Sequence, residues 1–173
     1  MTIDNRLLKE LTKRQEHATE LVIFGNFLAE QAVFVDSADF SQCRFTGDAI
    51  FDGATFRASA IFNGALFDGT ARFSHASFRG KTMFAGTIFS SDVKFISTRF
   101  ATTTSFEGAT FEHVFWFERT LCEGQTTFSS VTFTQLAWFN STSFKGNVRF
   151  ARTSFVAETS FDNSEFHGSA NFI

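Results

Sequence analysis

Phenylalanine recurs along the chain at two alternating intervals, six residues and then five. The series runs from Phe34 to Phe172 and contains 26 positions, of which phenylalanine fills 25 and Cys122 fills one. Three other phenylalanines, Phe24, Phe27 and Phe115, lie outside the series. We call its members the phenylalanine positions.

A small residue stands two places before every phenylalanine position but one, as with Ala54 before Phe56 and Thr104 before Phe106. A small and a large side chain two residues apart lie on the same face of a strand. Glycine recurs two places after many phenylalanine positions, where a chain that turns a corner every five or six residues needs backbone freedom. The pattern predicts short strands joined by corners.

Helices do not account for this spacing. Alternating intervals of six and five match neither the 3.6-residue nor the 3.5-residue period, so the rings would spiral around a helix. The segment is also rich in Thr, Ser, Gly and Phe, which are modest helix formers at best. A helix bundle is therefore disfavoured.

Three runs repeat one phenylalanine-centred motif: FDGATF (51–56), FNGALF (62–67) and FEGATF (106–111). They resemble the pentapeptide-repeat family, and the resemblance covers residues 30–173. It implies an all-β fold, a right-handed quadrilateral β-solenoid in which four short faces make one coil. The extra residue in every second unit departs from the family pattern, and it predicts a 22-residue coil rather than a 20-residue one.

We prefer the 22-residue coil to an 11-residue one, because two faces per turn leave too little perimeter to enclose the rings. Phenylalanines separated by one coil then form four ladders, with Phe40 on Phe62 and Phe45 on Phe67. Successive rings lie ~4.8 Å apart along the axis, the distance between hydrogen-bonded strands. Residues 34–172 make about six such coils.

Residues 1–22 carry a different pattern. Ile3, Leu7, Leu11, Ala18 and Val22 form one apolar stripe, and polar residues occupy most of the other positions. This predicts an amphipathic helix that caps the first coil; the alternative is a helix that binds a partner or a membrane surface. We therefore expect a cap and junction in residues 1–29, which include Phe24 and Phe27, and the solenoid in residues 30–173.

Cys122 replaces a phenylalanine in the same coil in which Phe115 replaces a small residue. This predicts volume compensation within one layer of the core. Cys43 also occupies an inward position, and the two cysteines lie about 17 Å apart along the axis. A disulfide cannot span that distance.

Composition and charge mainly exclude classes of protein. The formal net charge is −3, and residues 37–173 hold twelve acidic and eleven basic residues, which is typical neither of a polybasic nucleic-acid binder nor of a strongly anionic rod. The longest apolar run, 21–29, is too short for a transmembrane helix. No secretory signal is visible, so we expect a cytoplasmic protein without membrane attachment.

No catalytic or cofactor-binding motif is present. The four histidines share no metal-ligand spacing, and the FxGxxF runs contain corner glycines rather than a phosphate loop. The carboxylates are scattered over outward positions. The sequence therefore predicts a non-enzymatic protein without a metal or cofactor.

Candidate contact surfaces come from outward residues that stack once per coil. Ile61 stacks on Met83 and Leu66 on Ile88, which places four apolar side chains on two adjacent faces. A second series reads Arg72, Lys94, Trp116, Trp138 on another face. Ordinary strand propensity also accounts for such residues.

The C-terminal coil is a third candidate surface. Its phenylalanines are Phe155, Phe161, Phe166 and Phe172. An uncovered coil presents aromatic faces and unpaired strand groups, which favours end-to-end association. We expect a homodimer through this coil, and the resemblance implies the same, since C-terminal dimerisation is found among pentapeptide-repeat proteins.

Three functional classes follow. We favour a structural or protein-interaction module whose partner protein the sequence does not name. The resemblance implies, as an alternative, a DNA-mimicking binder of a type II topoisomerase such as gyrase, which the near-neutral surface disfavours. The third class is nucleic-acid or glycan binding along the series Arg72, Lys94, Trp116 and Trp138, which we call the tryptophan series. The absence of a broad basic patch disfavours this class.

Overall fold

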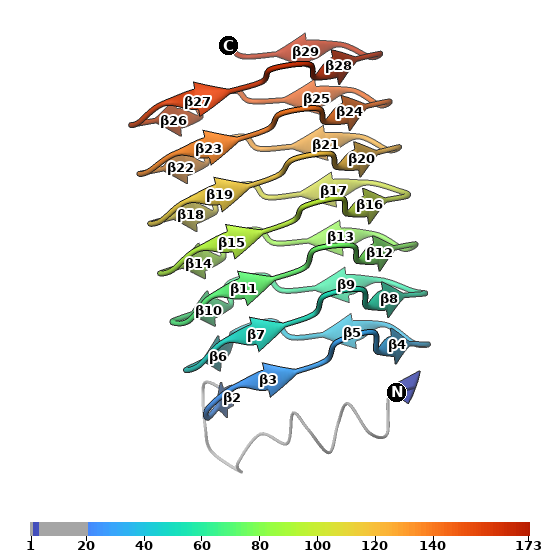
Figure 1. Ribbon diagram of the computed structural model, residues 1–173. Coiled ribbons are helices and arrows are strands. Elements are labelled where there is room, and N and C mark those ends of the chain that lie inside the picture. The colour runs from blue at the N-terminus through green and yellow to red at the C-terminus, as the bar shows by residue number, and fades with distance from the viewer. Residues whose placement is uncertain (1, 4–20) are drawn as a thin grey trace.

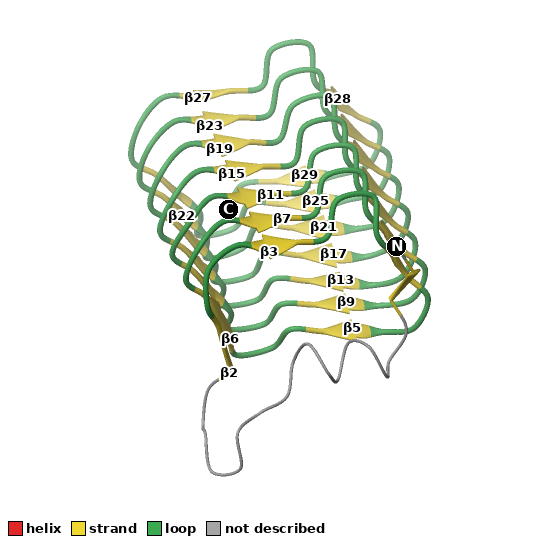
Figure 2. Cartoon of the chain, turned by 60° about the horizontal axis from the view of Figure 1, so that its bottom comes forward, coloured by secondary structure: helices red, strands yellow, loops and turns green. Residues whose placement is uncertain are grey.

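The computed structural model describes residues 2–3 and 21–173, and in these ranges the chain forms a four-sided β-solenoid of about seven coils. Each side is one parallel sheet to which every coil contributes one short strand (Figure 1). Viewed more nearly along the axis, the four sides enclose the core and loops form the corners (Figure 2). We name the four sheets A to D.

The strands of each sheet follow in order along the axis. Sheet A contains β1 (Thr2–Ile3), β4 (Val33–Phe34), β8 (Thr55–Phe56), β12 (Ser77–Phe78), β16 (Arg99–Phe100), β20 (Leu121–Cys122), β24 (Ser143–Phe144) and β28 (Glu165–Phe166). Sheet B contains β2 (Leu21–Ile23), β6 (Cys43–Phe45), β10 (Leu66–Phe67), β14 (Ile88–Phe89), β18 (Thr110–Phe111), β22 (Thr132–Phe133) and β26 (Ser154–Phe155). Sheet C contains β3 (Phe27–Leu28), β7 (Ala49–Ile50), β11 (Ala71–Arg72), β15 (Val93–Lys94), β19 (Phe115–Trp116), β23 (Ala137–Trp138) and β27 (Thr159–Ser160). Sheet D contains β5 (Ala38–Asp39), β9 (Ala60–Ile61), β13 (Thr82–Met83), β17 (Thr104–Ser105), β21 (Thr126–Thr127), β25 (Val148–Arg149) and β29 (Ala170–Asn171).

The strand register confirms the 22-residue coil. Phe67 pairs with Phe45 on one side and with Phe89 on the other. The ring of Phe40 stacks on that of Phe62, with centroids 5.1 Å apart and planes 12° apart. An 11-residue coil would instead bring Phe40 onto Phe51, whose ring lies edge-on to it at 74°.

The first coil begins earlier than the phenylalanine series, which is why about six coils were expected and about seven are present. Ile23 pairs with Phe45, and Phe27 pairs with Ala49, so both residues belong to the first coil. Phe27 is buried in the core, and its assignment to a junction was wrong. Ala29 stands 22 residues before Phe51, where the ladder of sheet C would otherwise continue with a phenylalanine. The ring of Phe27, two residues earlier, fills the space that this missing ring leaves, 5.3 Å from Phe51.

The expected N-terminal helix is not found where the structure describes its residues. Thr2–Ile3 and Leu21–Ile23 are strands that pair with β4 and β6, so the ends of the expected helix were assigned wrongly. The stretch 4–20, which carries most of its apolar stripe, lies outside the described residues. In the described ranges no helix is long and apolar enough to cross a membrane.

The core is a continuous stack of phenylalanine rings. Most rings separated by one coil are close to parallel, as for Phe34 on Phe56 (4.4 Å, 2°) and Phe144 on Phe166 (5.2 Å, 12°). Burying each ring contributes ~2–3 kcal/mol of transfer free energy before entropy is subtracted. Buried hydroxyls also link neighbouring coils, because Thr98 Oγ1 donates a hydrogen bond of 2.7 Å to the Phe73 carbonyl.

The corners use glycine for two different reasons. After sheets C and D, the residue two places beyond the phenylalanine position has positive φ, as at Gly86 (63°) and Ser97 (57°). After sheets A and B, the corresponding glycines beyond the first coil have no positive φ but lie against the preceding coil, whereas Gly25 in the first coil has a φ of 73°. A Cβ added to Gly69 would lie 2.5 Å from the Gly47 carbonyl carbon. Backbone freedom therefore explains only the first kind of corner.

The Cys122 layer shows how the core accommodates its exception. The Phe117 ring lies nearly parallel to those of Phe100 (5.8 Å) and Phe144 (6.3 Å), the residues above and below Cys122 in its ladder. It is tilted by 56° from Phe139, in its own ladder. Phe115 in turn lies 5.4 Å from Phe139. Phe117 thus fills the space beside Cys122, and Phe115 fills the space that Phe117 leaves.

Candidate interaction surfaces

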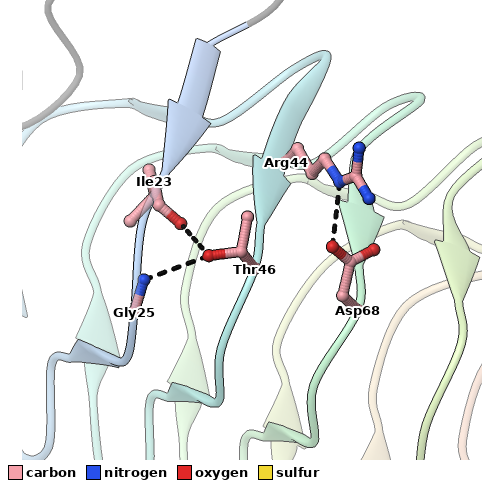
Figure 3. A network of polar contacts seen from close by, with 5 residues as sticks. All are labelled: Ile23, Gly25, Arg44, Thr46 and Asp68. Atoms are coloured by element: carbon pink, nitrogen blue, oxygen red, sulfur yellow. Dashed lines mark hydrogen bonds and ion pairs between the residues drawn. The ribbon is translucent and has the colours of Figure 1, made fainter.

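The outer surface consists of side chains on either side of each buried strand residue, and three arginine–carboxylate pairs link neighbouring coils among the described residues. Arg44 Nε lies 2.8 Å from Asp68 Oδ2, and in the same region Thr46 Oγ1 accepts from the Gly25 amide and donates to the Ile23 carbonyl (Figure 3). Arg99 is paired with Glu123 at 2.7 Å, and Arg72 with Asp52. These pairs neutralise acidic side chains along the outside.

The structure brings together the four apolar residues that the sequence suggested. Ile61 pairs with Met83 in sheet D, and Leu66 pairs with Ile88 in sheet B. The chain passes directly from β9 to β10, so the two pairs lie on either side of one corner. Ile88 is 41% exposed and the other three are partly exposed. We call this group the apolar edge.

The predicted tryptophan series is also present in sheet C. Arg72, Lys94, Trp116 and Trp138 follow one another in register. Lys94 Nζ lies 4.9 Å from the centre of the Trp116 ring, a cation–π contact. Both basic residues of the series therefore already have partners within the chain: Arg72 forms an ion pair with Asp52, and Lys94 makes the cation–π contact with Trp116.

Two apolar residues beside the tryptophans were missed from the sequence. Val114 and Leu136 precede the buried residues Phe115 and Ala137, and both are partly exposed. Because side chains alternate between the two faces of a strand, Val114 points outward with Trp116, and Leu136 with Trp138. Alternation around the buried residue was the available signal, but the prediction took as outward only the residues directly before and after each phenylalanine position. Val114 and Leu136 lie three places before Phe117 and Phe139.

The C-terminal coil is the third candidate surface. Its strands β26, β27, β28 and β29 each lie at the end of a sheet, with a hydrogen-bonded neighbour on one side among the described residues. Phe166 is 38% exposed and Phe172 is 53% exposed, whereas Phe155 and Phe161 are partly buried. Val156 and Ile173 are also exposed.

The described residues hold no cluster of three or more potential metal ligands. Burial raises the pKa of the Cys122 thiol to about 12, which keeps it protonated and unreactive at neutral pH.

His167 contacts Lys145 at 2.8 Å and Glu165 at 3.0 Å on the exposed surface of sheet A. A shallow hollow lined by Glu30, Gln31, Asp52, Gly53 and His75 is polar, and its Asp52 already binds Arg72.

Comparison with known proteins identifies the repeat. The family model described as "Pentapeptide repeats (9 copies)" matches residues 29–77 and 73–121, together more than half of the chain. No curated protein matches the chain. A solved structure of trypsin-treated QnrB1, a plasmid-mediated fluoroquinolone resistance protein, is 13% identical over 84% of this chain and 89% of that chain, with a TM-score of 0.25. This last similarity is too low to support an argument. The family match and the four-sided phenylalanine core together show that the chain belongs to the pentapeptide-repeat family.

Proposed function

We propose that the chain is a non-enzymatic protein-interaction module that acts through its outer surface. The observation that carries the proposal is the apolar edge, where Ile61, Leu66, Met83 and Ile88 lie together on two consecutive coils. Phenylalanine rings fill the interior, so ligands have access only to the outside. Apolar groups gathered on a protein surface are typical of sites that bind proteins.

We further propose that the C-terminal coil forms a homodimer. Phe166 and Phe172 offer apolar surface, and contact buries it at about 25 cal/mol per Å². The end strands also offer backbone groups that a second copy can pair. A twofold contact uses the same surface on both partners.

Light scattering on three proteins tests both surfaces. The intact chain should be dimeric, Phe166→Asp/Phe172→Asp should be monomeric, and Leu66→Asp/Ile88→Asp should remain dimeric. Loss of the dimer only in the last variant would move the self-contact to the apolar edge. A monomeric intact chain at the highest soluble concentration would contradict both self-contacts and leave the apolar edge for a different protein.

Binding to a type II topoisomerase as a DNA mimic is the second candidate. One observation favours it, because acidic residues gather on sheets B and C and their shared corner. The acids on this side are Glu30, Asp48, Asp52, Asp68, Asp92, Glu112, Glu118, Glu158 and Asp162, and the bases are Arg44, Arg72, Lys94 and Arg119. Two of these acids are paired with arginine, so the row is interrupted.

A gyrase supercoiling assay separates the two candidates. The interaction-module proposal expects unchanged supercoiling when the intact chain is added in excess over the enzyme. Inhibition that weakens in Glu112→Gln/Glu118→Gln, but not in Glu107→Gln on sheet D, would favour DNA mimicry instead.

A further inference from the structure

Sheet C carries a second apolar surface, formed by Val114, Trp116, Leu136 and Trp138. The four side chains occupy two consecutive coils, two on each side of the buried residues Phe115 and Ala137. All four are partly exposed. We call them the tryptophan patch. Tryptophan is the residue most often found to dominate protein–protein binding energy.

The rim of the tryptophan patch is acidic. Its charged residues are those of the adjacent outward positions in the same or neighbouring coils. The acids are Asp92, Glu118, Glu158 and Asp162, and the bases are Lys94 and Arg119. An acidic rim attracts cationic side chains and repels phosphate groups, which argues against nucleic acid as the ligand.

The patch also contains an example of the contact that a cationic partner would make. Lys94 lies over the Trp116 ring at 4.9 Å. Trp138 stands one coil further, between Trp116 and Ser160 in the register, and among the described residues no lysine or arginine lies over its ring. The Trp138 ring is therefore available to a cation from outside.

We propose that the tryptophan patch binds a protein segment in which an apolar side chain is flanked by arginine or lysine. The apolar side chain packs against Leu136 and Trp138, and a basic side chain lies over Trp138 and beside Glu118 or Glu158. This inference rests on the proposed interaction function and names a partner class for a surface other than the apolar edge.

Selection from a random peptide library displayed on phage, with the intact chain as target, tests the proposal. The expected consensus combines an apolar or aromatic residue with arginine or lysine. A selected peptide, measured by fluorescence anisotropy, should bind Trp138→Ala at least about tenfold more weakly, as expected of a central aromatic residue. Trp138→Phe should recover part of the loss, because its ring still attracts cations.

Two further comparisons separate the patch from the rest of the surface. Glu118→Gln/Glu158→Gln should weaken binding several-fold and reduce its dependence on salt, because it removes the acidic rim. Ser77→Ala, an outward residue of sheet A that belongs to none of the candidate surfaces, should leave the affinity unchanged. Thermal unfolding of each variant verifies that the fold is intact.

Several results would overturn the proposal. These are a neutral or acidic consensus, no enrichment at all, or undiminished binding to a folded Trp138→Ala protein. Loss of self-association in Trp138→Ala would instead assign the patch to a second copy of the chain. If the light-scattering results are as expected, a failure of peptide selection or of the Trp138→Ala binding test would remove only this partner class and would leave the interaction-module proposal in place.

Discussion

At the residue scale, the layer around Cys122 shows that the core conserves volume rather than residue identity at each position. Phe117 lies between Phe100 and Phe144 beside the thiol, and Phe115 occupies the remaining space. The sequence predicted that the extra volume of Phe115 compensates for the volume lost at Cys122. It could not show that Phe117 changes its stacking partners, because that depends on ring orientation and not on spacing.

Cys122→Phe should destabilise the protein by about 1–3 kcal/mol, because a ring is added where Phe117 already fills the space. Adding Phe115→Ala should recover part of this loss, since it lets Phe117 return to its own ladder. Urea unfolding at equilibrium measures both variants. If the two substitutions destabilise additively, compensation within this layer is refuted.

Cys122 also predicts a pH dependence. Its pKa rises from the ordinary 9.0 to about 12 because burial disfavours the thiolate. Between these values the unfolded state loses the proton and the folded state keeps it, so the stability present below pH 9 falls as pH rises toward 12. Cys122→Val should show a shallower decline in its free energy of unfolding over this range. Equal slopes for the two proteins would contradict the assignment.

At the element scale, two-residue strands are held by their neighbours rather than by their own length. Each strand inside a sheet pairs in parallel with the strands one coil before and one coil after it. Beyond the first coil, corners alternate between a positive-φ turn and a close approach to the preceding coil. The regular intervals made the strands and their register predictable from sequence. The first coil was not, because Ile23 and Ala29 replace phenylalanine there.

The two kinds of corner predict different costs for adding a methyl group. Gly69→Ala should destabilise strongly, by up to about 3 kcal/mol, since its Cβ would meet the backbone of Gly47. Gly86→Ala meets no atom within 4 Å and should cost about 1 kcal/mol, because only its positive φ opposes the substitution. Chemical unfolding of the two variants tests this order. A larger loss for Gly86→Ala would show that backbone conformation, not close approach, limits the corners.

At the scale of the whole molecule, the coil turns distant residues into surface patches. Ile61 and Met83 stand together, as do Trp116 and Trp138, because the members of each pair are separated by one full coil. These surfaces were therefore predictable from the sequence once the coil length was known. That Val114 and Leu136 belong to the tryptophan patch was not predicted, because their outward orientation follows from the alternation of side chains around Phe115 and Ala137.

The coil length is the central claim, and a disulfide between coils tests it most directly. Ser105 and Thr127 pair in register on the outside of sheet D. Neighbouring parallel strands lie ~4.8 Å apart, which suits a disulfide. Ser105→Cys/Thr127→Cys should therefore oxidise within one chain, as shown by mass spectrometry after alkylation. The control Lys94→Cys/Ser105→Cys, with its cysteines half a coil apart on sheets C and D, should not. Cross-linking of the control but not of the first pair would contradict the 22-residue coil.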